Sequence, residues 1–76
     1  MATRGYVLIE TTMGKTKEVA GALQSLEGLK SVNVVTGPYD IIAIVEGKNA
    51  DAIGQLVTGN IHHIPGVSRT LICLVF

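Results

Sequence analysis

Two different spacings of apolar residues divide the chain into successive segments. The run from Arg4 to Thr12, RGYVLIETT, is rich in β-branched and aromatic residues and stops at Gly14, which is typical of a strand. From Lys15 to Glu27 the apolar positions recur every three or four residues, and polar residues fill the other side. These apolar positions are Val19, Ala22, Leu23 and Leu26. The pattern predicts a strand followed by an amphipathic helix, with Gly28 as the helix stop.

Two further β-rich runs follow, Lys30 to Thr36 and Asp40 to Glu46, and only Gly37-Pro38-Tyr39 separates them. A connection of this length and composition is typical of a hairpin. The pattern therefore predicts two antiparallel strands that are neighbours in one sheet.

A second helix and a last strand complete the chain. Asn49 is placed to cap the helix, and Asp51 in the first turn is favoured by the helix dipole. The buried stripe of this helix is predicted to be Ile53, Leu56, Val57, Ile61 and Ile64. Pro65-Gly66 ends the helix, and the apolar run from Val67 to Phe76 predicts a strand.

The predicted order β-α-β-β-α-β also repeats internally, because the motif LEGL after the first helix resembles IPGV after the second. A pair of split βαβ units is the ferredoxin-like arrangement. We therefore expect residues 1–76 to form a single α+β domain of this class. It would have a four-stranded antiparallel sheet with two helices on one face.

Both faces of the predicted sheet are apolar. Along the third strand, residues at odd and even positions are apolar alike, and the last strand follows the same pattern. Two helices cover only one face, so we expect a homodimer that packs sheet against sheet and forms the unit of a larger ring, an octamer or a similar assembly. The alternative, that a small domain simply exposes some apolar surface, remains open.

Length and composition favour oligomerisation. A chain of 76 residues buries only about 60–65% of its unfolded surface and is marginally stable alone. Its single cysteine cannot form an internal disulfide, and no Cys/His group has the spacing of a structural zinc site. A second copy is then the remaining source of stability.

Charge argues against nucleic acid or membrane as direct partners. Six basic and six acidic residues give a net charge of zero, and the isoelectric point is near 6.7. Such a chain has no field that attracts a phosphate backbone or an anionic membrane. No segment approaches the roughly 20 apolar residues of a membrane span. With a lone thiol as well, we expect a cytoplasmic protein.

Candidates for catalytic or metal chemistry are few. His62 and His63 are adjacent on a predicted helix, where neighbouring side chains point about 100° apart and cannot share one metal ion. Cys73 lies in an apolar strand and is expected to be a buried hydrophobe. Of the carboxylates, Glu10, Asp40 and Glu46 at strand ends have placements that need explanation. No P-loop, CxxC or Ser-His-Asp arrangement is present, so we expect no enzyme, no cofactor and no metal.

The connection Thr36-Gly37-Pro38-Tyr39-Asp40 carries a hydroxyl, a flexible backbone, a ring and a carboxylate. These are also ordinary turn residues, and a turn requires nothing more. A free amino acid, however, needs an anion for its ammonium group and N–H or O–H donors for its carboxylate, and this segment offers both. The residues alone leave both interpretations open.

Three stretches carry a resemblance to a known family: YVLIETTMGKTKEVAGAL, LEGLKSVNVVTGPYDIIAIVEG and HIPGVSRTLICLV. Together they resemble the effector-binding RAM domain of the Lrp/AsnC transcription regulators over nearly the whole chain. The specific parts are VVTGPYD before an apolar strand and IPGV-x-x-T after the second helix. The resemblance implies dimerisation through sheets, further assembly into rings, and small effectors, typically amino acids, held between subunits.

The resemblance also implies site residues. The effector loop of the family corresponds to Thr36, Gly37, Tyr39 and Asp40, and its last-strand wall corresponds to Ser68, Thr70 and Ile72. Asp40 would meet the ammonium group of the ligand. The Gly37 N–H and the Ser68 or Thr70 hydroxyl would meet its carboxylate.

The family's regulators carry an N-terminal helix-turn-helix domain, whereas here the first predicted strand begins within a few residues of Met1, so we expect that domain to be absent. We therefore expect a stand-alone ligand-sensing module, which modulates transcription or amino acid metabolism through assembly. A chain cut from a longer regulator is the other possibility. Two rival functions remain: a ligand-free scaffold or hetero-oligomer partner of a full-length Lrp-like regulator, and a small dimeric enzyme.

Overall fold

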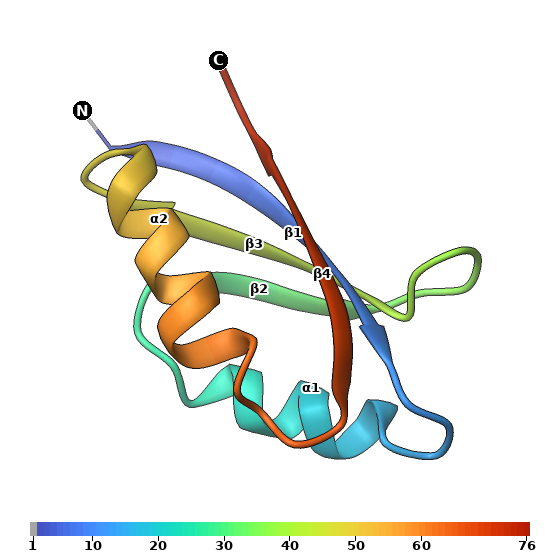
Figure 1. The fold of residues 1–76 in the computed structure, drawn as a ribbon. Helices are drawn as coiled ribbons and strands as arrows, with labels where there is room; N and C mark the ends of the chain where they lie inside the picture. The colour runs from blue at the N-terminus through green and yellow to red at the C-terminus, as the bar shows by residue number, and fades with distance from the viewer. Residues whose placement is uncertain (1) are drawn as a thin grey trace.

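The computed structural model describes residues 2–76 and shows an antiparallel sheet with both helices on one face (Figure 1). The elements are β1 (Thr3–Thr11), α1 (Thr16–Gln24), β2 (Leu29–Val34), β3 (Ile41–Gly47), α2 (Ala50–Leu56), a π-helical turn η1 (Val57–Ile61) and β4 (Val67–Leu74). The four strands lie in the order β2-β3-β1-β4. The predicted βαββαβ class and the hairpin of β2 and β3 are confirmed.

The core lies between the helices and one face of the sheet. Val7 of β1 is opposite Ala43 of β3 and Ile72 of β4, and such cross-strand partners share a face. The fully or nearly fully buried side chains are Val7, Ile9, Val19, Ala20, Leu23, Ile41, Ala43, Val45, Ile53, Val57 and Ile61. Burial of each Val, Leu or Ile contributes about 1.5–3 kcal/mol, so this layer is the main source of stability.

The first helix is shorter than the pattern predicts. It ends at Gln24 rather than Glu27, because Ser25 and Leu26 donate backbone hydrogen bonds to Ala22 and Leu23, and this closes a tight turn. The side chain of Leu26 still packs against the core. Gly28 follows with a φ of 89°, as expected for a helix-stop glycine.

The second helix begins as predicted and ends differently. The Asn49 side chain accepts a hydrogen bond of 2.9 Å from the Ala52 N–H, which confirms the cap. A continuous α-helix to Ile64 was the wrong expectation, since α2 gives way to η1 at Val57. There the Thr58 hydroxyl donates to the Gly54 carbonyl, the acceptor that an α-helix reserves for the Thr58 N–H.

The strand ends differ from the expectation by one or two residues. β2 stops at Val34 and β3 starts at Ile41, so the connecting loop is Val35–Asp40 rather than three residues. β4 ends at Leu74 instead of Phe76, although the Val75 N–H still donates to the Arg4 carbonyl at 2.8 Å. These shifts do not alter which side chains face the core.

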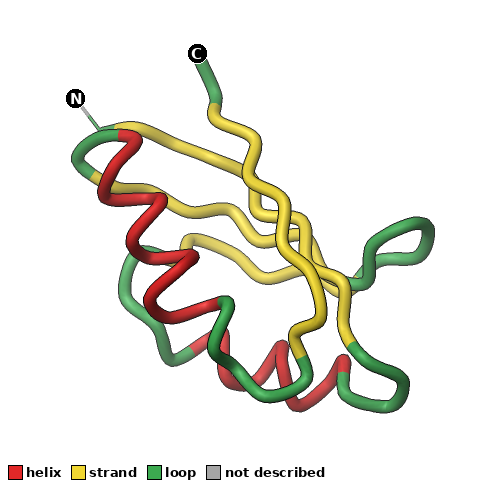
Figure 2. Tube along the Cα trace, in the orientation of Figure 1, coloured by secondary structure: helices red, strands yellow, loops and turns green. Residues whose placement is uncertain are grey.

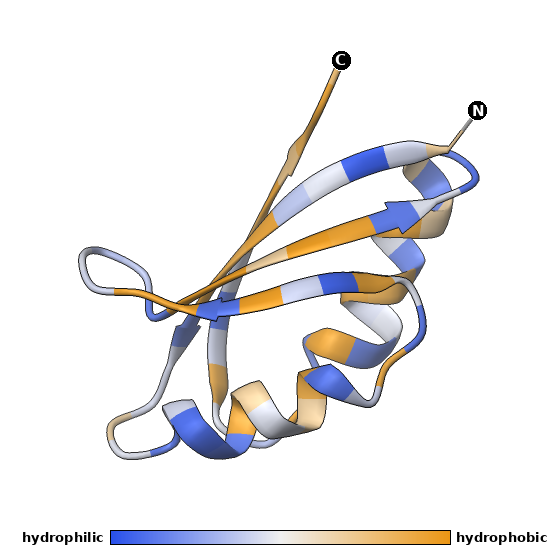
Figure 3. Cartoon of the chain, turned by 180° about the vertical axis from the view of Figure 1, so that it is seen from behind, coloured by the Kyte–Doolittle hydropathy of each residue, from blue (hydrophilic) through white to orange (hydrophobic). Residues whose placement is uncertain are grey.

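The sheet face away from the helices, which we call the open face, is apolar along its centre. Its apolar side chains are Tyr6, Leu8, Ile42, Ile44, Leu71, Cys73 and Val75. The hydrophobic stretches of the strands are visible from behind in Figure 3. The prediction of two apolar faces is therefore confirmed. Cys73 was expected to be buried, but it is exposed, because its strand partner is Tyr6 of the open face.

The helices are short, and both lie against the sheet (Figure 2). Among residues 2–76, no helix has the length and apolar character needed to cross a bilayer.

Gly66, between η1 and β4, packs closely against residues at the start of α1. Its φ is 103°, and a Cβ at this position would lie 2.9 Å from Lys15 Cβ and 3.0 Å from Val19 Cγ2. Gly66→Ala is therefore expected to lower the free energy of unfolding by about 1–3 kcal/mol in denaturant titrations. Gly21→Ala, in α1 with open space around it, is the control and should raise it by about 0.5–1 kcal/mol. A Gly66→Ala protein as stable as wild type would contradict this packing.

Candidate functional site

The loop Val35–Asp40 closes the hairpin of β2 and β3 and projects from one end of the sheet (Figure 1). The Val35 N–H donates to the Asp40 carbonyl at 2.9 Å, and the Asp40 N–H donates to the Ile9 carbonyl at 3.0 Å. Gly37 has a φ of 126°, with no other atom near the position of a Cβ. The backbone conformation, rather than lack of space, therefore requires glycine there.

Within this loop, Thr36 and Gly37 are exposed, whereas Tyr39 and Asp40 are half-buried. The Asp40 Oδ2 accepts hydrogen bonds from the Thr11 N–H at 2.8 Å and from the Thr11 hydroxyl at 3.1 Å. The Thr11 Oγ1 also lies 2.7 Å from the Thr16 Oγ1. The Asp40 carboxylate is thus held at the end of β1 and has a fixed orientation.

The three candidate residues of β4 have different surroundings. Ser68 is exposed, and its hydroxyl lies 3.0 Å from the Glu10 carbonyl oxygen and 3.2 Å from Glu10 Oε1. Thr70 is half-buried and opposite Ile9, so it lies on the helix-facing side of the sheet. Ile72 packs against the core.

The loop and the start of β4 lie at the same end of the sheet, with the end of β1 between them. Ile9 shows this directly: its carbonyl accepts the Asp40 N–H, and its strand partner on the other side is Thr70. The structure therefore brings Thr36, Gly37, Tyr39 and Asp40 together, and it places Ser68 and Thr70 across β1 from them. Ile72 lies farther along β4 and contributes to the core.

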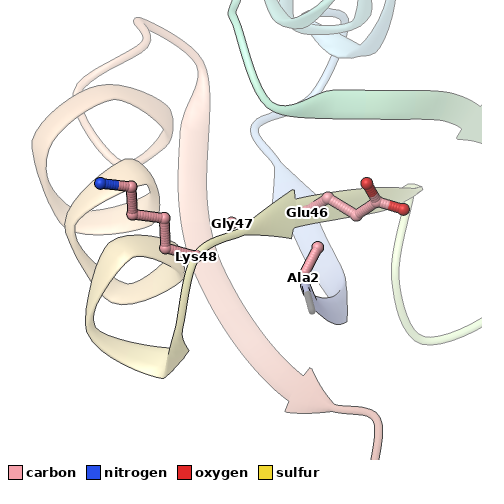
Figure 4. Close-up of a pocket in the computed structure, with 4 residues that line it drawn as sticks. All are labelled: Ala2, Glu46, Gly47 and Lys48. Atoms are coloured by element: carbon pink, nitrogen blue, oxygen red, sulfur yellow. The ribbon is translucent and has the colours of Figure 1, made fainter.

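A shallow depression of about 550 Å³ lies at the opposite end of the sheet, lined by Ala2, Glu46, Gly47 and Lys48 (Figure 4). The Glu46 and Lys48 side chains point in opposite directions in this view. Small-molecule sites usually have convergent polar groups, so this geometry does not favour a ligand there.

Glu46 belongs to a charged cluster at the edge of the open face. Its carboxylate lies 2.9 Å from Arg4 Nη2 and 3.6 Å from Lys30 Nζ. The hydrogen bond from Arg4 lowers the pKa of Glu46 below its ordinary value of 4.5, against desolvation, and the charges of Lys30 and Arg4 add to the lowering. A lowered pKa is opposite to what a general acid requires at neutral pH.

The three strand-end carboxylates thus all have structural partners: Glu46 has Arg4 and Lys30, Asp40 has Thr11, and Glu10 has Ser68. Sequence reasoning missed Thr11 and Thr16, because Thr11 lies 29 positions from Asp40 and nothing in the local sequence connects them. Their only signal was a hydroxyl at the predicted end of the first strand and another at the start of the helix.

The rings of His62 and His63 lie edge to face, with centroids 6.3 Å apart. Among residues 2–76, no three His, Cys, Asp or Glu side chains gather in a group that could hold a metal ion.

The family of the chain follows from its comparison with known proteins. A protein-family model described as the Lrp/AsnC ligand binding domain matches residues 4–76. The chain is also 33% identical over 79 residues to an uncharacterised helix-turn-helix-type transcriptional regulator of Pyrococcus furiosus, and it covers 53% of that protein. The chain therefore belongs to the Lrp/AsnC family and is a ligand-binding domain of the RAM type. It spans about half the length of the curated relatives it matches.

Solved structures agree with the fold. TTHA0845 of Thermus thermophilus is 32% identical with a TM-score of 0.92, and the match covers 97% of this chain and 92% of that one. A transcriptional regulator of Neisseria meningitidis, solved as a complex with L-Met, has a TM-score of 0.87 at 14% identity, over 97% of this chain and 49% of that one. At this identity the second likeness shows the fold alone.

The Glu46 cluster predicts a specific pH dependence of stability. Because the pKa of Glu46 is lower in the folded than in the unfolded chain, its ion pairs stabilise the fold above pH 4.5 and are lost as pH falls through the folded-state pKa. Glu46→Gln should therefore melt below wild type at pH 7, and the difference should shrink as the pH falls below 4.5.

Thermal unfolding from pH 3 to pH 7, with Glu27→Gln as the control, measures this effect. Glu27 forms no ion pair with residues 2–76, so its variant should follow wild type throughout. A constant difference between Glu46→Gln and wild type across the whole range would show that the ion pairs do not contribute.

Proposed function

We propose that this protein is an oligomeric ligand-sensing module that binds an amino acid or a related small metabolite at its subunit interfaces. The observation that carries this proposal is the Asp40 carboxylate, held by Thr11 within an exposed glycine loop of a Lrp/AsnC ligand-binding domain. An anchored carboxylate costs little further ordering when it meets a cation, and preorganisation of this kind favours binding.

Each end of an amino acid has a partner in this arrangement. The free oxygen of Asp40 receives the ammonium group, and the exposed Gly37 offers its N–H to the carboxylate. Ser68 and Thr70 lie across β1 from the loop, so we assign their hydroxyls to the ligand of a neighbouring subunit. The L-Met complex of the Neisseria protein supports an amino acid as the class of ligand, on the strength of a shared fold.

The open face supports the oligomer. Its central side chains on three neighbouring strands are apolar, and Tyr6 and Leu71 are 42% and 46% exposed in the single chain. A patch of this kind on a small domain is typical of a protein interface. We therefore propose a homodimer through this face and further assembly into an octamer or a similar ring. Ligand binding then shifts the assembly by no more than its differential affinity for the two states.

A second function is favoured by one observation, the length of the relatives. The matched regulator of Pyrococcus furiosus is of the helix-turn-helix type, and this chain corresponds to about half of it. A domain of the same family can form mixed assemblies with such a regulator through equivalent faces. In this case the protein acts as a hetero-oligomer partner in the cytoplasm. The regulator, rather than this chain of zero net charge, then contacts the nucleic acid.

The amino acid site is tested by thermal shift against each of the twenty standard amino acids. A ligand that binds only the native state must raise the melting temperature by mass action. Asp40→Asn keeps an acceptor for Thr11 and removes the charge, so affinity should fall by about tenfold or more. Asp51→Asn, in the first turn of α2, is the control and should bind as wild type does. Equal binding by Asp40→Ala and wild type would show that the ligand does not meet Asp40.

The sheet-to-sheet dimer is tested by a charge on the open face. Ile42→Glu would place an unpaired carboxylate in the apolar centre of the interface, at a cost of several kcal/mol. Light scattering during size exclusion should show a monomer, whereas Met13→Glu, at a position 99% exposed in the turn before α1, should keep the mass of wild type. An unchanged mass for Ile42→Glu would place the interface elsewhere.

A further inference from the structure

Three side chains form a continuous series of hydrogen bonds at one corner of the sheet, which we call the corner chain: Thr16, Thr11 and Asp40. The Thr16 and Thr11 hydroxyl oxygens are 2.7 Å apart, and the Thr11 hydroxyl lies 3.1 Å from Asp40 Oδ2. An ionised carboxylate only accepts, so the single hydroxyl hydrogen of Thr11 goes to Asp40. Thr16 must then donate to Thr11, and the chain runs in one direction, toward the carboxylate.

The corner chain connects three elements that are distant in sequence. Asp40 ends the loop before β3, Thr11 is the last residue of β1, and Thr16 is the first residue of α1. The neighbouring Thr12 N–H donates to the Gly66 carbonyl at 2.8 Å, which brings the start of β4 to the same corner. The candidate loop is therefore attached to the scaffold at a point where four elements meet.

Two backbone hydrogen bonds close the base of the hairpin, from the Val35 N–H to the Asp40 carbonyl and from the Asp40 N–H to the Ile9 carbonyl. The corner chain reinforces this base by connecting Asp40 to β1 and α1, and it also sets the orientation of the carboxylate. Oδ2 accepts both bonds from Thr11, while Oδ1 accepts none from residues 2–76.

From this geometry we infer that Thr11 and Thr16 are positioning residues for ligand recognition. Thr11 holds Oδ2 toward the scaffold, so that Oδ1 is directed to the ammonium group of the ligand, and Thr16 orients the Thr11 hydroxyl. This inference rests on the proposed function and adds to it two residues that never touch the ligand. It also gives α1 a direct connection to the binding loop.

The test uses substitutions that keep side-chain shape. Thr11→Val removes the hydroxyl and keeps both the branched shape and the backbone N–H. Thr11→Ser keeps a hydroxyl at this position. Thr16→Val removes the hydroxyl that donates to Thr11, the first hydrogen bond of the corner chain. Thr58→Val is the matched control, because it removes a hydroxyl that bonds to Gly54 in α2 and takes no part in the corner chain. All four are measured in the full chain at one protein concentration.

Amide hydrogen exchange measures how firmly the corner chain holds the base of the loop, and it needs no ligand. The Val35 and Asp40 amides are both hydrogen-bonded at the base of the loop, so they should exchange about fivefold to tenfold faster in Thr11→Val than in wild type. Thr11→Ser should exchange as wild type does, and Thr16→Val should be intermediate. Exchange in Thr11→Val equal to that in Thr58→Val would overturn the inference, whether or not any amino acid binds.

Ligand affinity tests whether Asp40 Oδ1 is oriented toward the ammonium group of the ligand. The probes are the twenty standard amino acids and, for each one that binds wild type, the carboxylic acid with the same side chain and hydrogen in place of the amino group. Thr11→Val should weaken the amino acid about fivefold to tenfold and leave the deaminated acid unchanged, because the deaminated acid has no donor to meet Asp40. On an Asp40→Ala background, Thr11→Val should have no further effect.

The possible failures are distinguishable. If wild type and Thr11→Val bind the amino acid equally while exchange differs, the corner chain is only structural and the inference is overturned, but the proposed site stands. If wild type binds none of the amino acids, the proposed function fails and the recognition role of both threonines fails with it.

Discussion

Two short helices can cover only one face of a four-stranded sheet, and this constraint determines most of what is distinctive about the protein. Val7, Ile9, Ile41, Ala43 and Val45 fill one face and are shielded from water by α1, α2 and η1. The intervening positions of the same strands are also apolar, and neither helix of residues 2–76 lies over them. The open face is therefore part of the same sequence pattern as the core, and an uncovered apolar sheet face of this kind is typical of a protein interface.

Polar and charged side chains lie at both ends of the open face. Arg4, Glu46 and Lys30 form a cluster at one end, and Glu10 and Ser68 interact at the other. Charges at the rim of an apolar patch contribute little to affinity, but they fix register and exclude wrong partners. Glu46 and Glu10 thus both have side-chain partners, and the lowered pKa of Glu46 reflects pairing with Arg4 rather than preparation for acid catalysis.

The candidate site depends on the corner where β1, α1, β4 and the loop before β3 meet. A loop with an exposed glycine is mobile unless side chains anchor it, and Asp40 supplies the anchor through Thr11. Under the proposed function, the same carboxylate has two roles, with one oxygen toward the scaffold and the other toward the ligand. The turn sequence TGPYD would then be both a hairpin connection and a recognition element of this Lrp/AsnC domain.

The sequence by itself determined the order of the elements, the βαββαβ class and the two apolar faces, because side-chain periodicity depends only on local backbone geometry. It also determined the glycines at helix ends and the Asn49 cap, which are local as well. The π-helical end of the second helix and the early end of the first were decided by hydrogen bonds of Thr58 and Ser25 that compete with the helix. The exposure of Cys73 and the attachment of Asp40 to Thr11 and Thr16 came only from the tertiary structure. Strand register and the meeting of residues 29 positions apart decide such contacts, and no local pattern of residues encodes them.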